Sequence, residues 1–157
     1  MTDTALPYPA FEDFAAGDIT TYGRYEVTKE EVIAYATEFD PQPFHLDEEA
    51  GRASMLGGLA ASGWHSSAML MRLNCDGFMV GSTSMGSSGI EEMQWLKPVY
   101  PGDILAVRRE ILETRASASR PEMGIVRFRF ELINQRGEVV LVQINPIFFR
   151  RRSAGAA

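Results

Sequence analysis

Asp40 and His45 are the two side chains in this sequence whose types and spacing best suit acid–base chemistry. They lie close together in the segment 39–45, FDPQPFH, which directly follows a predicted helix and is interrupted by two prolines. An acid and a neutral histidine on one short segment can hold a single water molecule, one accepting its proton while the other orients it. Because catalytic groups commonly lie on loops held between packed elements, we predict that this pair forms the centre of a site.

Each candidate residue also has a structural interpretation that the sequence leaves open. Asp40 could be an Asx-turn residue at a helix end, and His45 a structural histidine with satisfied hydrogen bonds. Gly63 could be an ordinary residue at the entry to a helix. The choice between these interpretations depends on the elements that surround the three residues.

Nucleophilic and metal chemistry have weaker support. Ser62 is predicted to be a helix cap or a small packed residue, because no histidine-plus-acid arrangement points to it as a nucleophile. His65, the second histidine, is predicted to pack in the same helix. Two histidines and one cysteine, Cys75, are too few for the usual zinc ligand sets, so we predict no metal site.

The N-terminal half is predicted to be mainly helical. Thr28 and Glu31 have the spacing of a capping box, which starts a helix, and Pro41 ends it, because a residue before proline avoids the helical conformation. A later segment is apolar nearly all round a helix, and such helices are usually buried. The predicted elements are a strand over 19–27 and helices over 28–40, from after His45 to Ala53, and from about Gly63 to Leu73.

The C-terminal half is predicted to be β-structure. Residues 123–133 alternate apolar and polar side chains with the period of two that marks a half-buried strand. The Gly- and Ser-rich segment 74–89 is predicted to be a loop. The predicted strands are 90–96, 104–114, 123–133 and 138–150, with turns at 97–103 and 134–137. We therefore predict an α+β fold in which a curved antiparallel sheet wraps around one central apolar helix.

Length and composition indicate one globular domain. The chain has 157 residues, 45% hydrophobic and 23% charged, and a net charge of -6, which argues against non-specific nucleic-acid binding. We expect a single domain over 1–157, with an extended arm at 1–18 and a frayed tail at 153–157. The single cysteine favours a reducing compartment, and no segment resembles a secretory signal or a membrane span. We expect a cytoplasmic protein.

Several spaced motifs resemble the MaoC-like dehydratases, a family that includes the R-specific enoyl-CoA hydratases. The family signature is an acid, any residue, Asn, Pro, an aliphatic residue and His, and residues 40–45 read DPQPFH. The match holds at Asp40, Pro43 and His45 and departs at Gln42 and Phe44. GRYEVTKEEVIAYATEFD, GGLAASGW and KPVYPGDIL resemble the family's strand and helix, helix entry and turn, so the resemblance covers about 11–149.

The resemblance implies a hot-dog fold, a homodimer or higher homo-oligomer, and hydration or dehydration of a trans-2-enoyl thioester in fatty acid metabolism. Asp40 and His45 correspond to the water-holding residues, and the backbone N–H of Gly63 to the donor that stabilises the enolate oxyanion. The residues assigned to substrate contacts are Gln42, Ser62, Trp64, Gly86 and Gly89. The substrate is carried by coenzyme A or an acyl carrier protein, and no other cofactor is expected. The alternatives are a hot-dog acyl-CoA thioesterase and a non-catalytic acyl-CoA-binding protein.

Overall fold

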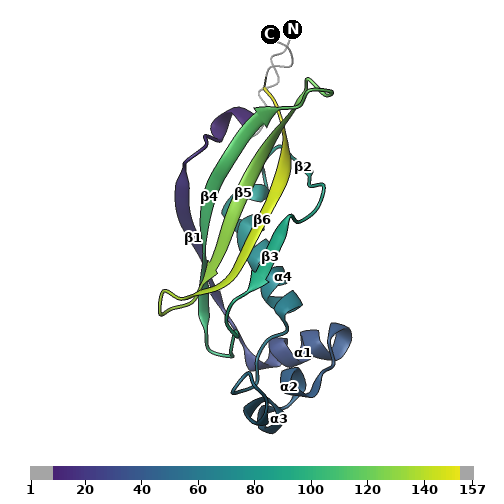
Figure 1. Cartoon of the computed structure of the whole chain (residues 1–157), viewed down its shortest axis with the longest axis vertical. Helices are drawn as coiled ribbons and strands as arrows, with labels where there is room; N and C mark the ends of the chain where they lie inside the picture. The colour runs from purple at the N-terminus through teal and green to yellow at the C-terminus, as the bar shows by residue number, and fades with distance from the viewer. Residues whose placement is uncertain (1–8, 153–157) are drawn as a thin grey trace.

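The chain forms one antiparallel sheet with a long helix against it and a group of short helices at one end (Figure 1). The computed structural model describes residues 9–152, so the predicted tail at 153–157 and the first eight residues of the predicted arm lie outside the described residues. The elements in chain order are η1 (Phe11–Asp13), β1 (Ile19–Glu26), α1 (Lys29–Phe39), α2 (Pro43–Leu46), α3 (Glu48–Ala53), α4 (Gly63–Asn74), η2 (Cys75–Met79), β2 (Ser84–Gly86), β3 (Glu92–Trp95), β4 (Ile104–Ala116), β5 (Met123–Ile133) and β6 (Val139–Arg150).

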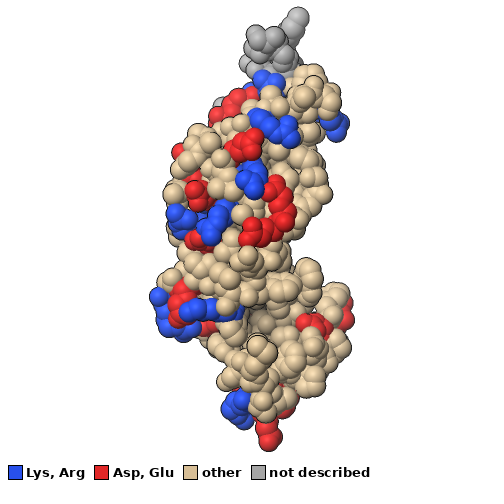
Figure 2. Space-filling model, viewed as in Figure 1, with Lys and Arg blue, Asp and Glu red and all other residues tan. Residues whose placement is uncertain are grey.

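The sheet has the strand order β1-β4-β5-β6, and both β2 and β3 pair with the free side of β6. Along β5 the side chains alternate as predicted, and the inward ones are fully buried: Val126, Phe128, Phe130 and Leu132. The outward side chains form ion pairs, for example Arg127 with Glu91 at 2.8 Å. Acidic and basic residues are accordingly interspersed over the face seen in Figure 2. The period of two thus assigned one face of the strand to the core and the other to solvent.

Helix α4 packs on the inner face of the sheet through Met69, Leu70 and Leu73, each almost fully buried. Its outer face is different, because Trp64 is 60% exposed and Met71 45% exposed. Within a single chain the sheet therefore covers one side of this apolar helix, and the opposite side is left uncovered. Among the helices of residues 9–152, none combines the length and the apolar character that a membrane span requires.

Two predicted loops contain regular structure. Residues 43–46 form the short helix α2, which Pro43 favours because proline suits the first helical turn, where its missing N–H costs nothing. The segment 74–89 contains the π-helical turn η2 and the short strand β2. Phe78 in η2 contacts the rings of Phe14 and Phe128, so burial of an aromatic side chain favours regular backbone in a Gly-rich segment.

The described part of the N-terminal arm packs against the body. Residues 11–13 form a single turn of 3₁₀ helix, and Ala10 and Phe14 beside it are buried. The Phe11 ring lies so close to Gly124 that a Cβ there would be 2.1 Å from it. This segment is therefore held by the sheet and is not extended throughout.

Candidate active site

Asp40 is the first residue after α1, and its conformation follows from the proline beside it. Its N–H still donates to the Ala36 carbonyl at 2.9 Å, but φ and ψ of -149° and 68° take it out of the helix. Pro41 disfavours the helical conformation at this position. The carboxylate accepts two hydrogen bonds, from Ser62 Oγ to Oδ2 at 2.6 Å and from Gln42 Nε2 to Oδ1 at 2.7 Å. Each oxygen of the Asp40 carboxylate therefore has a hydrogen-bond donor that holds it in place.

His45 lies on α2 with its ring buried against that carboxylate. Its Nδ1 is 2.7 Å from the Ala60 carbonyl oxygen, which only accepts hydrogen bonds, so Nδ1 carries the proton. With the proton on Nδ1 alone, Nε2 is an acceptor, and it lies 3.4 Å from Asp40 Oδ2. Two acceptors that face each other across this distance can both receive the protons of one water molecule. The arrangement is the one expected of a pair that holds and activates water.

The hydrogen bond from Ser62 is the main reason that the pKa of Asp40 lies below its usual value. Burial opposes this effect, while Gln42 and the nearby His45 lower the pKa further. Ser62 is completely buried and stands just before α4, yet its hydroxyl bonds to Asp40 and not to the helix N–H groups. Asp40 is therefore ionised at neutral pH and able to accept a proton.

Ser62→Ala is expected to lower kcat/KM at neutral pH by about 10- to 100-fold for a reaction in which Asp40 accepts a proton. The reason is that a hydrogen bond to a charged group contributes ~1.5–3 kcal/mol. Loss of this bond also raises the pKa of Asp40, so the acidic limb of the kcat/KM profile moves to higher pH. A pH–rate profile measures both effects. Ser82→Ala removes a hydroxyl that donates to the Met79 carbonyl at 2.6 Å and serves as the control. An unshifted acidic limb in Ser62→Ala would show that Asp40 does not control the rate.

Gly63 is the first residue of α4, so its N–H has no acceptor within the helix and stands at the positive end of the helix dipole. A Cβ at this position would lie 2.7 Å from the Trp95 ring, which shows that the indole covers the glycine. Gly63, His45 and Trp95 line the same cavity of about 330 Å³. Most of the remaining lining is apolar and includes Leu56, Ala60, Ala61, Leu96, Val99 and Val140.

The other predicted site residues lie in three different places. Gln42 and Ser62 contact the Asp40 carboxylate, so their contact with substrate stays a prediction. Trp64 packs edge-on against Trp95 with ring centroids 5.1 Å apart, outside the cavity lining. Neither Gly86 nor Gly89 lines the cavity.

The distance of Gly86 from the cavity follows from the pairing of β6. Gly86 is paired with Phe148 near the C-terminal end of β6, while the cavity contacts Val140 near its start. Eight residues of strand separate these points, or about 26 Å at ~3.3 Å per residue. Within one chain, Gly86 therefore lies away from this cavity, and the contact of Gly86 and Gly89 with the coenzyme A arm stays a prediction.

Three contacts around the candidate site were not predicted from the sequence. Trp95 covers Gly63, the Ala60 carbonyl sets the His45 tautomer, and Leu56 lines the cavity from an irregular turn. Only Trp95 carried a usable signal, as a large aromatic residue at the end of a predicted strand. The Ala60 contact depends on a backbone carbonyl, which residue type does not reveal.

His65 is buried beside this site but stacks on Tyr35, with ring centroids 4.5 Å apart and planes 4° from parallel. Burial lowers its pKa to about 4, so the ring is neutral at physiological pH. This stacking agrees with the packing role predicted for it. Across residues 9–152, no group of three or more histidine, cysteine, aspartate or glutamate side chains is arranged to hold a metal ion.

The fold and this site define the class of protein. The family model described as the MaoC like domain matches residues 15–127, and the chain belongs to the MaoC-like dehydratase family. The sheet around α4 is the hot-dog fold, as predicted.

Among solved structures, the MaoC-like dehydratase from Rhodospirillum rubrum is 44% identical, with a TM-score of 0.82 over 91% of this chain and 98% of that one. The R-hydratase PhaJ1 from Pseudomonas aeruginosa shares the fold at 20% identity, with a TM-score of 0.70 over 94% and 93% of the two chains. Mesaconyl-CoA hydratase from Cereibacter sphaeroides is 31% identical over 49% of this chain, which corresponds to 22% of that longer protein.

Proposed function

We propose that the protein hydrates a trans-2-enoyl thioester to the 3-hydroxyacyl thioester and catalyses the reverse dehydration. One observation carries this proposal: His45, whose Nε2 faces Asp40 at 3.4 Å, and Gly63, at the start of α4, line one largely apolar cavity. A hydratase needs water beside the β-carbon, a donor beside the thioester oxygen, and an apolar space for the acyl chain. The cavity offers all three within one site.

The geometry supports a simple sequence of steps. Water donates hydrogen bonds to His45 Nε2 and Asp40 Oδ2, and its oxygen bonds to the β-carbon as the pair takes one proton. The electrons of the double bond move to the thioester oxygen, where the Gly63 N–H stabilises the enolate. A proton returned by the pair to the α-carbon completes the addition, and the protein is unchanged. No metal or redox cofactor takes part in these steps.

The protein is proposed to form a homodimer or a higher homo-oligomer, in which a second copy covers the exposed apolar surfaces. Trp64 and Met71 on the outer side of α4 are exposed, and so are Trp95 and Leu96 at the edge of the sheet. An exposed, apolar sheet edge is uncommon in monomers, because it invites pairing with another chain. The similarity to mesaconyl-CoA hydratase supports an acyl-CoA substrate. A cytoplasmic location stays a prediction.

The test is to incubate the protein with crotonyl-CoA while following enoyl absorbance and free thiol together. Hydration predicts loss of enoyl absorbance with no release of thiol. Release of thiol before any loss of the double bond would instead identify a thioesterase. Binding of crotonyl-CoA with neither change would identify a non-catalytic acyl-CoA-binding protein.

A further inference from the structure

We propose that Tyr100 is a positioning residue that restricts the site to short acyl chains by holding the turn at 54–58 against the cavity. This inference rests on the proposed function and specifies its substrate class. The cavity of about 330 Å³ lies at the lower end of the ~300–1,000 Å³ range of small-molecule pockets. Leu56, at the centre of this turn, lines it and is partly buried, and Met55 borders it with a fully exposed side chain. The position of the turn therefore sets how long an acyl group can be accommodated.

The turn at 54–58 is held mainly by its own short-range hydrogen bonds. Ser54 Oγ donates to the Gly51 carbonyl at 2.7 Å and accepts from Leu56 N–H at 3.1 Å. Gly57 has a φ of 75°, a left-handed conformation suited to glycine. These bonds shape the turn, but they do not fasten it to the sheet. A contact from within the turn itself to the rest of the fold comes from Tyr100, whose hydroxyl donates to the Leu56 carbonyl.

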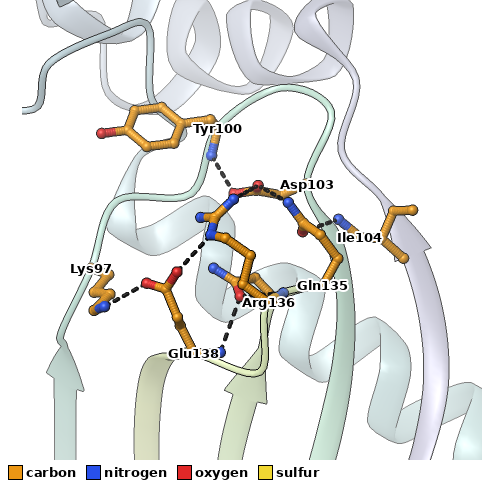
Figure 3. A network of polar contacts seen from close by, with 8 residues as sticks. Lys97, Tyr100, Asp103, Ile104, Gln135, Arg136 and Glu138 are labelled. Carbon is orange, nitrogen blue, oxygen red and sulfur yellow. Dashed lines mark hydrogen bonds and ion pairs between the residues drawn. The ribbon is translucent and has the colours of Figure 1, made fainter.

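Tyr100 can restrain the turn because its own backbone is fixed at both polar groups. Its N–H donates to Asp103 Oδ2 at 2.9 Å, and its carbonyl accepts from Asp103 N–H at 3.0 Å. Gly102 supplies the φ of 92° that this tight turn requires. In Figure 3 the ring extends from this turn away from the polar network, and it also lies against Gly58, where a Cβ would be 3.4 Å from it. The hydroxyl therefore projects from a rigid base.

The base is joined to the hairpin between β5 and β6. Gln135 Nε2 donates to Asp103 Oδ1 at 3.0 Å, and its Oε1 accepts from Ile104 N–H at 2.9 Å (Figure 3). Glu138, on the same hairpin, pairs with Lys97, which lines the cavity. Hydrogen bonds from Lys97 and Arg136 lower the pKa of Glu138 to about 2, so this carboxylate stays charged at neutral pH. One wall of the cavity is thus connected to the sheet through Tyr100.

The test compares wild type with Tyr100→Phe on trans-2-enoyl-CoA substrates of four, six, eight and ten acyl carbons. Wild type is expected to prefer the short substrates. In Tyr100→Phe, the ratio of kcat/KM for the ten-carbon to the four-carbon substrate should rise about fivefold, which is the size expected for loss of one neutral hydrogen bond. The change should appear in KM for the long substrates, with kcat for crotonyl-CoA nearly unchanged. Leu56→Ala, which shortens the lining side chain directly, should shift the preference in the same direction.

Tyr25→Phe is the matched control, because it removes a tyrosine hydroxyl that donates to Glu31 at a distance of 3.0 Å. Neither Tyr25 nor Glu31 lines the cavity. Amide hydrogen exchange of residues 55–58 provides a readout that needs no turnover, and it should become faster in Tyr100→Phe only. If wild type hydrates no enoyl-CoA, the proposed function fails, whereas the exchange result still decides whether Tyr100 restrains the turn. Unchanged exchange, or a chain-length profile in Tyr100→Phe equal to that of wild type, would overturn the inference.

Discussion

Asp40→Asn and His45→Ala should each lower kcat for enoyl-CoA hydration by about 100- to 10,000-fold, the range that general acid–base catalysis contributes. Asn at position 40 can still accept the hydrogen bond from Ser62, but it is a poor proton acceptor. Ala at position 45 removes the Nε2 atom that faces Asp40 at 3.4 Å. Steady-state kinetics with crotonyl-CoA measures both losses.

The fold should survive the Asp40→Asn change, because the replacement is nearly isosteric. Circular dichroism and thermal unfolding should therefore match those of the wild-type protein. Asp76→Asn, at an exposed carboxylate paired with Arg72 at 3.0 Å, is the matched control and should keep full activity. Retention of more than a tenth of wild-type kcat in Asp40→Asn would remove this residue from the proposed mechanism.

Gly63→Ala is expected to lower kcat by about 100- to 1,000-fold, the usual effect of losing one oxyanion donor. The added Cβ would lie 2.7 Å from the Trp95 ring, so either the indole or the start of α4 must move. A movement of the helix start takes the N–H away from the thioester oxygen. The measurement is kcat for crotonyl-CoA hydration, with KM determined in the same experiment.

A second variant separates steric displacement from other effects of the methyl group. In Gly63→Ala combined with Trp95→Leu, the smaller side chain leaves room for the Cβ, and part of the lost kcat should return. Trp95→Leu alone should alter KM more than kcat, because Trp95 lines the cavity but carries no group that acts on the reacting atoms. Full activity of Gly63→Ala would contradict the expectation that the added Cβ displaces the start of α4.

The long strands were predicted closely because burial on one face imposes a period of two on their side chains. Residues 123–133 were predicted as a strand, and β5 is Met123–Ile133. Helix α1 was predicted from its cap, and the Thr28 side chain does accept the Glu31 N–H at 3.2 Å. Glu31 does not complete the reciprocal pair, since its carboxylate accepts from the Tyr25 hydroxyl. A tertiary contact thus competes with the local capping pattern.

The details of the site depended on contacts that sequence spacing does not contain. Gln42 stands where the family has Asn, and its longer side chain places the amide within 2.7 Å of Asp40 Oδ1. Ser62 reaches the same carboxylate from twenty-two residues away, through the approach of α1 to the start of α4. The four-residue α2 was missed because one helical turn is too short to show a helical period.

The cover over Gly63 depends on how β3 is placed in the sheet. Trp95 is paired with Leu141 of β6, and this register brings the indole over the start of α4. Strand register between segments so far apart in the chain follows from the assembled sheet, because each strand alone fits more than one pairing. The sequence therefore indicated the candidate residues, and the structure was needed to find what surrounds them.

The central claim is that water is added to the β-carbon of an enoyl thioester at the site formed by Asp40, His45 and Gly63. The most direct test is to run the reaction with crotonyl-CoA in H₂¹⁸O and to locate the label by mass spectrometry. The account predicts intact 3-hydroxybutyryl-CoA with ¹⁸O in its hydroxyl group, formed by wild type and almost absent with Asp40→Asn. Label in the carboxylate of a released free acid would contradict it, because water would then have attacked the thioester carbonyl.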